Sequence, residues 1–237
     1  MRGYAFRVAA ITMMCTVICA GAISVPAAIG ASAPQLAQQP EPLRTLDAKA
    51  PITYFIADGS GKPGYRSSDR QLALWALQAW ERSAAGRFHF TAAPEASALV
   101  RVYWAAPEGE YGEMQPLVVG GRRGAAVFIR ADTESLGPDM AALVRNDDVL
   151  RDSIVYLTCL HELGHALGLP HTQDFRDIMY YFGYGGDIAR YFERYRMQLH
   201  SRNDIASVSG LSDADVSHIR AAYAPANGST NGPTNGK

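Results

Sequence analysis

The sequence predicts one α+β domain between an apolar leader and a polar tail. Short runs of β-branched and aromatic residues, of which 52–57 is the clearest, alternate with longer segments whose apolar residues recur at helical spacing, as in 69–84. The 237 residues, 48% of them hydrophobic and 19% charged, supply enough chain for one core. The net charge is −1 and no basic run is longer than Arg122-Arg123, so nothing indicates a nucleic-acid partner.

The N-terminal segment has the composition of a targeting sequence. Arg2 and Arg7 precede an uncharged apolar run at 8–25, and small residues follow that run. We therefore expect residues 1–33 to be a signal peptide or, because the run also reaches the lower length limit of a membrane span, an uncleaved N-terminal anchor. In both cases the domain is exported, as a secreted, periplasmic or cell-surface protein, and it meets a membrane only if the leader is retained.

The segments on either side of the domain are polar or low in complexity. Residues 34–50 are rich in Pro, Gln and Ala and are expected to form a linker or a short pro-segment, and 225–237 is a Gly-rich polar tail expected to be disordered. Two of the 3 cysteines lie in the leader, so Cys159 has no partner for an intrachain disulfide in the mature domain. On a helix Cys159 would lie about 160° around from His161, so we interpret it as a core thiol.

Five strands are expected within the domain. The run 52–57 is followed by a loop rich in Gly and Pro, which ends the strand. The later strands are expected where apolar and β-branched residues alternate or cluster, with a glycine-rich loop at 120–124 between the last two. These four segments are 87–91, 98–105, 117–119 and 125–131.

Helix boundaries carry local signals. Ser68 with Gln71, and Ser212 with Asp215, have the spacing of a capping box. Gly137-Pro138 breaks the chain, and the acidic residues that follow favour a helix N-terminus. The expected helices span 69–84, 148–168, 189–199 and 212–223, and the acids at the start of the second are Asp147, Asp148 and Asp152.

The most specific signal is the stretch 161–171, which reads H-E-x-x-H-x-x-G-x-x-H. Two histidines four residues apart project from one face of a helix, so both can bind the same ion. Gly168 can adopt a positive φ and Pro170 cannot continue a helix, so the chain turns back and delivers His171 as a third nitrogen ligand. Three protein ligands with an open fourth position are typical of a catalytic zinc site, and Glu162 is placed to act on the water there.

At these residues the sequence resembles the metzincin zinc endopeptidases, and within them the matrixin-like subgroup. Met179 lies eight residues beyond the third histidine, and its surroundings resemble the methionine-containing turn that this family places beneath its zinc. The segments 77–80 and 211–216 resemble parts of the first and last helices of matrixins. The resemblance spans roughly 51–224 and is strongest over 161–180.

The resemblance implies a catalytic domain at 51–224 with a twisted, mostly parallel sheet of about five strands, an active-site helix, a Met-turn and a C-terminal helix. It implies one catalytic Zn²⁺ held by His161, His165 and His171. It also implies that the enzyme hydrolyses internal peptide bonds with Glu162 as the general base. A protein or peptide substrate would bind as an extended strand along the sheet edge, which is β-augmentation. We expect the protein to be a monomer.

Three features depart from the matrixin pattern. Tyr181 replaces a proline and stands where astacins and serralysins carry a tyrosine that binds zinc, so it is a candidate fifth ligand or oxyanion stabiliser, the alternative being an aromatic wall. No histidine lies between 90 and 160, so a second zinc is expected to be absent. Asp132 and Glu134 are the candidate ligands for Ca²⁺, but both are better explained as solvated acids of a loop. No cysteine lies between 20 and 158, which excludes latency through a cysteine switch.

Two other functions would use the same residues. A non-catalytic metzincin-like module would grip peptides without cutting them, although such modules usually lose the Glu or one His. A zinc hydrolase would act instead on a non-peptide amide. His200 and His218 lack paired acids or a partner at ligand spacing, and His89 points to the opposite face of its strand from Phe88 and Phe90, so all three are interpreted as surface residues.

Overall fold

The computed structural model describes residues 44–104 and 111–225. Its strands are β1 (Ile52–Ile56), β2 (Phe90–Ala92), β3 (Val100–Trp104), β4 (Gly112–Val119) and β5 (Arg122–Ile129). Its α-helices are α1 (Asp69–Ser83), α2 (Pro138–Asn146), α3 (Asp148–Ala166), α4 (Ile188–Arg196) and α5 (Asp213–Ala222). Short 3-10 helices lie at η1 (Glu95–Ser97), η2 (Thr133–Leu136), η3 (Phe182–Tyr184) and η4 (Arg202–Ala206).

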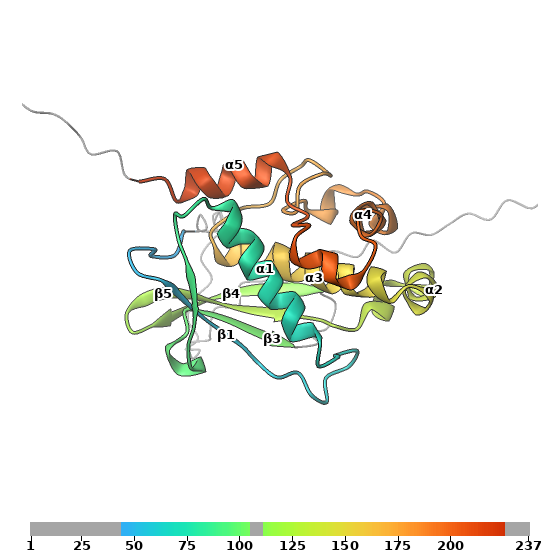
Figure 1. Ribbon diagram of the computed structural model, residues 1–237, viewed down its shortest axis with the longest axis horizontal. Coiled ribbons are helices and arrows are strands. Elements are labelled where there is room, and N and C mark those ends of the chain that lie inside the picture. The colour runs from blue at the N-terminus through green and yellow to red at the C-terminus, as the bar shows by residue number, and fades with distance from the viewer. Residues whose placement is uncertain (1–43, 105–110, 226–237) are drawn as a thin grey trace, which may run out of the picture.

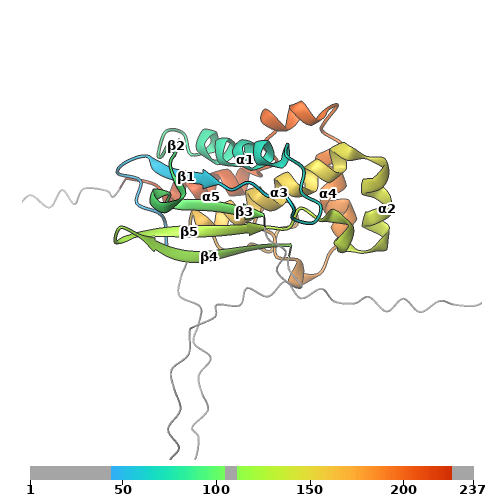
Figure 2. The ribbon, with the colours of Figure 1, turned by 90° about the horizontal axis from the view of Figure 1, so that it is seen from below.

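The strands form one sheet in the order β2-β1-β3-β5-β4. The pairs β1–β2, β1–β3 and β3–β5 are parallel, and β4 pairs with β5 in the antiparallel direction. Figure 2 shows β4 as the outermost strand, beyond β5. The expected mostly parallel sheet of about five strands is confirmed for the described part of the chain.

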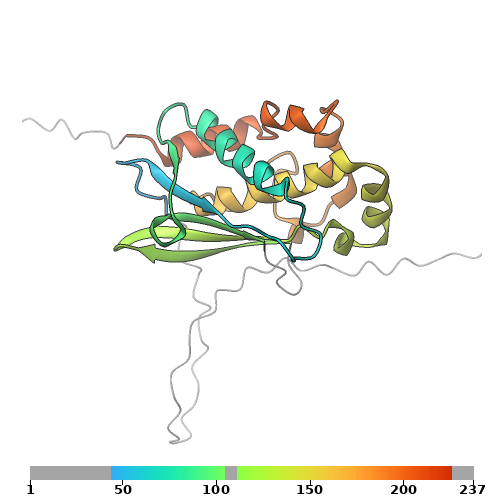
Figure 3. The same ribbon diagram turned by 60° about the horizontal axis from the view of Figure 1, so that its bottom comes forward.

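The helices gather on one face of this sheet (Figures 1 and 3). In β3, Val100, Val102 and Trp104 are buried and the residues between them are half-buried, so one face of the strand enters the core. The central helix is α3, in which every residue from Leu150 to Ala166 is buried. Trp80 of α1 donates its indole N–H to the Leu160 carbonyl of α3 at 2.9 Å, which fixes the two helices against each other.

The expected helices are confirmed, with differences of up to three residues at their ends. Asp147 accepts a hydrogen bond from Leu150 N–H at 2.9 Å and begins α3, and both halves of the capping box at Ser212 are present. The capping box at Ser68 is wrong, because its side chain makes no cap. The chain is already turned before α1, so Asp69 N–H donates to the Arg66 carbonyl at 2.8 Å and Gln71 N–H donates to the Ser68 carbonyl at 3.1 Å in place of a hydroxyl cap.

The observed strand boundaries differ more from the expected ones. The expected strand 117–119 is only the end of β4, and the expected loop 120–124 is a tight hairpin turn at Gly120 and Gly121, whose φ angles are 56° and 76°. Two adjacent glycines satisfy a two-residue turn, so the arginines after them already belong to β5. Residues 87–89 of the expected strand 87–91 lie outside β2.

Helix α2 was not expected, because Gly137-Pro138 was interpreted only as a break. Pro138 is the first residue of α2, a position that tolerates a missing N–H. Pro138 therefore starts a helix after the break that it marks.

The predicted leader at 1–33 lies outside the described residues, as do 34–43 of the predicted linker and nearly all of the tail. The last residues of the linker pack onto the domain, since Leu46 is buried and its N–H donates to the Tyr223 hydroxyl at 3.1 Å. Within the described part of the chain, no helix is long and apolar enough to cross a membrane.

Candidate metal centre

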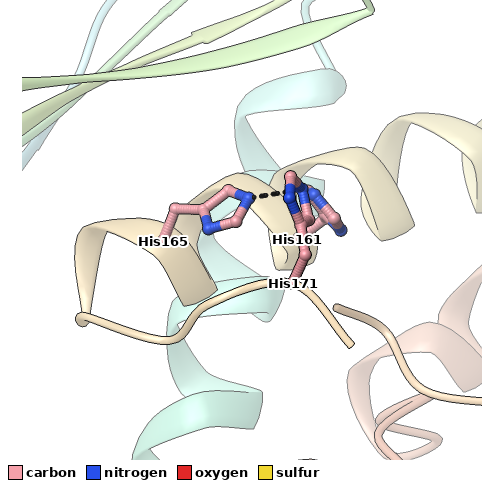
Figure 4. A group of neighbouring side chains, drawn as sticks. All are labelled: His161, His165 and His171. Atoms are coloured by element: carbon pink, nitrogen blue, oxygen red, sulfur yellow. Dashed lines mark hydrogen bonds between the residues drawn. The ribbon is translucent and has the colours of Figure 1, made fainter. Parts of the chain in front are cut away.

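The three motif histidines lie together, two on α3 and one on the chain that returns from it (Figure 4). The ring centroid of His171 is 5.3 Å from that of His161 and 4.5 Å from that of His165. One ligand nitrogen from each histidine lies within 4.8 Å of the others. Residues on adjacent turns of a helix and one residue outside it therefore offer three nitrogens to a single ion.

The return path that delivers His171 is built by backbone hydrogen bonds. Gly168 has a φ of 98°, which ends α3 in the conformation that glycine adopts without steric cost. Beyond the histidine, Thr172 N–H donates to the Met179 carbonyl at 2.8 Å, and Tyr181 N–H donates to the Thr172 carbonyl at 3.3 Å. The loop that carries the third histidine is thus held against the Met-turn.

Main-chain carbonyls orient two of the imidazole rings. The Nδ1 of His161 lies 2.6 Å from the Ile178 carbonyl, and the Nδ1 of His165 lies 2.9 Å from the Leu169 carbonyl. A carbonyl can only accept, so Nδ1 carries the proton and Nε2 keeps its lone pair for a metal. The Nε2 atoms of His165 and His171 face each other at 3.0 Å.

The state of the His161 Nε2 atom is the clearest indication of a bound ion. This atom is buried, and no hydrogen-bond partner for it is found among the described residues. A buried polar atom without a partner costs free energy and usually marks a functional site. A divalent cation between the three rings would supply that partner, so the residues present fit a metal.

Burial keeps the histidines neutral. It lowers the pKa of His161 to about 4 and holds the pKa of His165 well below its ordinary range. The pKa of His171 is also lowered by burial. Neutral imidazole is the form that binds a metal, so the site is ready for one at neutral pH.

Glu162 lies beneath the edge strand of the sheet. Its side chain is 1% exposed, and a Cβ added to Gly112 of β4 would come within 2.6 Å of its Oε1. The position needs a glycine because strand and carboxylate approach so closely. The sequence places Glu162 next to the histidines, but it gives no sign of this contact with β4.

Met179 packs directly under the helix of the motif. It is 1% exposed, and its sulfur fills the space that a Cβ on Gly164 would need. The turn itself is anchored by α5, because the Asp215 carboxylate accepts from Ile178 N–H at 2.8 Å. Asp215 was expected only to cap α5. The capping-box spacing with Ser212 did not reveal that its carboxylate also binds Ile178 N–H.

A family model described as Matrixin matches residues 46–212. The chain belongs to the matrixin family. No curated protein matches it as a relative. Membership makes the protein a zinc metallopeptidase, and the histidine triad is where the zinc of a matrixin would be held.

Tyr181 of this matrixin lies against the third histidine. Its ring stacks on His171 with the centroids 4.8 Å apart and the planes at 28°. This stacking limits the rotation of the His171 ring. The role of the Tyr181 hydroxyl as a fifth ligand or oxyanion stabiliser stays a prediction.

The remaining candidates lie away from the triad. His89, His200 and His218 are exposed, and Cys159 is a buried free thiol whose pKa is raised by burial, so these four interpretations are confirmed.

The two candidate calcium ligands already have other partners. Asp132 accepts from Glu134 N–H at 3.2 Å, and Glu134 pairs with Arg145 at 3.4 Å. Among the described residues, the triad is the one group of three or more His, Cys, Asp or Glu side chains that could hold a metal. Calcium therefore has no support from these residues.

Proposed function

We propose that this matrixin is an exported endopeptidase that hydrolyses internal peptide bonds of protein substrates with zinc and Glu162. The observation that carries the proposal is the convergence of three neutral imidazoles beside one buried carboxylate. Export is supported by the composition of the leader, and it is independent of the site geometry.

The metal supplies one part of the chemistry. Zinc held by His161, His165 and His171 would lower the pKa of water from near 16 to about 7 and would polarise the scissile carbonyl. Each histidine needs its second nitrogen fixed for this, and the Ile178 and Leu169 carbonyls do so for two of them.

Glu162 supplies the proton transfers. Its carboxylate takes the proton of the attacking water and then passes that proton to the leaving amine. Burial between α3 and β4 excludes bulk water from the carboxylate, so the transferred proton stays at the site. Tyr181, whose ring stacks on His171, stays the candidate fifth ligand or oxyanion stabiliser, and an aromatic wall is the alternative.

The free edge of β4 is the surface on which an extended substrate would bind. β4 is the last strand of the sheet and its first residue, Gly112, touches Glu162. A peptide that adds to this edge would pass beside the catalytic carboxylate.

Casein zymography with and without a chelator tests the proposal. We expect clearing that the chelator abolishes, and we expect Glu162→Gln to retain one zinc per chain while losing about two to four orders of magnitude in kcat/KM. Zinc binding without clearing of casein or cleavage of any peptide would favour a binding module or a hydrolase of non-peptide amides. Full activity of zinc-loaded Glu162→Gln would reject the general base.

A further inference from the structure

The outer edge of β4 has a defect in its row of hydrogen-bond donors. Within the described ranges, β4 pairs only with β5 and ends the sheet. Its eight residues include Pro116, which is exposed and has no N–H. Whether that matters depends on which side of the strand the backbone of Pro116 faces.

Two hydrogen bonds settle the direction. Arg130 N–H donates to the Tyr111 carbonyl at 2.9 Å, so Tyr111 turns its backbone toward β5 and the alternate residues, beginning with Gly112, turn theirs outward. Ala125, which stands opposite Pro116, donates its N–H to the Leu99 carbonyl on the β3 side at 2.7 Å. Both observations place the N and C=O of Pro116 on the free edge.

The free edge therefore presents an uneven row of partners. Gly112, Met114 and Val118 each offer an N–H and a C=O, and Pro116 offers a C=O alone. This also explains why a proline is tolerated within β4, since the ladder to β5 never needed its N–H. β4 therefore continues through Pro116, whereas the expected strand 117–119 covers only its last three residues.

An antiparallel arrangement fixes which part of a substrate meets the defect. Antiparallel pairs are the more stable and the more common, so we take this direction for a peptide on β4. The scissile bond lies near Gly112, which contacts Glu162. Substrate residues before that bond then run past Met114 and reach Pro116 four residues upstream of the residue opposite Gly112.

We propose that Pro116 limits substrate recognition on the N-terminal side of the scissile bond, so that strand pairing ends after the substrate residue opposite Met114. The proposal rests on the proposed endopeptidase function and adds a specificity-determining residue to it. A longer peptide would place a carbonyl against the proline ring and gain no second hydrogen bond there.

The competing explanation is that Pro116 only protects the edge from pairing with another copy of the chain. A proline on an edge strand serves that purpose in many sheets. This explanation predicts a change in self-association and none in the dependence on peptide length.

The test uses a peptide series lengthened one residue at a time on the N-terminal side of the scissile bond. Cleavage is measured as kcat/KM for the wild type and Pro116→Ala, and binding is measured as Kd in the zinc-loaded Glu162→Gln background with and without Pro116→Ala. Pro138→Ala is the matched control, because it removes an exposed proline from the first residue of α2, which is not part of the sheet. Thermal melts measure whether each variant folds, and sedimentation measures whether it self-associates.

In the wild type we expect kcat/KM to stop rising, and Kd to stop falling, once the peptide reaches past Met114. In Pro116→Ala, kcat/KM should rise and Kd should fall by about fivefold over the next two residues, which is the effect of about one net hydrogen bond. Identical length profiles in the wild type and the variant would overturn the proposal, as would new dimers of Pro116→Ala without any change in profile. If the wild type cleaves no peptide, the proposed function fails, and the binding profiles still decide the role of Pro116.

Discussion

The histidine triad and the cluster around Arg151 are two polar groups built around buried side chains of α3, and they differ in where their cation comes from. The triad consists of neutral side chains, with one nitrogen that has no partner among the described residues. The Arg151 cluster contains its own guanidinium. Its Nη2 donates to Asp69 at 2.8 Å, to the Gly64 carbonyl at 2.6 Å and to the Ala131 carbonyl at 3.2 Å.

The Arg151 cluster extends to a second arginine. Nη1 of Arg151 bonds to Asp69 and to Asp152, the latter at 3.1 Å, and Asp152 accepts from Arg202 Nε at 2.7 Å. Burial opposes the charge of Arg151, but its hydrogen bonds with the Asp69 and Asp152 carboxylates outweigh burial and raise its pKa. This cluster is complete without a ligand and holds loops to α3, whereas the triad is complete only when an ion is bound.

Metal removal should therefore separate the two regions most strongly. Chelation is expected to lower peptidase activity by more than about a thousandfold, because water without zinc keeps its pKa near 16. The near-UV circular dichroism of the protein, to which Trp75 beside Arg202 of this cluster contributes, should persist. Loss of that signal together with activity would show that the two regions do not behave independently.

Removing the internal cation should have the reverse effect. Arg151→Met leaves Asp69 buried without its partner and is expected to lower the free energy of unfolding by about 3–5 kcal/mol in urea melts. The folded fraction should still bind one zinc per chain. The double variant Asp69→Asn/Arg151→Met is the control, and it should recover part of the loss, since neither charge is then left alone.

Acid should destabilise the zinc-free protein through the triad. The folded pKa of His161, about 4, lies below the unfolded value near 6.5, so the unfolded state binds more protons between these values. The stability of the zinc-free protein is then present at pH 7 and falls as the pH drops from 6.5 to 4, by up to about 3 kcal/mol for this residue. Urea melts of the zinc-free protein across this range measure it. His161→Gln should remove this share of the dependence of unfolding free energy on pH. An unchanged dependence would contradict its assignment to His161.

The rim of the Arg151 cluster should matter least. Arg202 is 28% exposed, donates to the Ser68 carbonyl at 2.7 Å and lies over the Trp75 ring at 5.0 Å. Arg202→Ala is expected to lower the free energy of unfolding by about 1 kcal/mol, because water replaces part of what is lost. A loss as large as that of Arg151→Met would show that the rim and the centre are one cooperative unit.

The two regions also differ in how far local sequence could predict them. The triad follows from helical periodicity, a glycine and a proline within eleven residues, and the structure places its histidines together. The Arg151 cluster joins residues 82 positions apart in the chain, so no local pattern indicated it, and Asp152 was expected only as an acid at a helix N-terminus. Helix α2 was missed because Gly137-Pro138 was interpreted only as a break. The full length of β4 was missed because nothing in the local sequence shows that the backbone of Pro116 faces away from β5.

The central claim is that His161, His165 and His171 bind one zinc ion together. X-ray absorption at the zinc edge, combined with the metal content of the purified protein, tests it most directly. The claim predicts one zinc per chain with three nitrogen ligands at about 2.0–2.1 Å, and loss of that zinc in His171→Ala without loss of the fold. Zinc that is absent from the wild type, or that stays fully bound in His171→Ala, would contradict it.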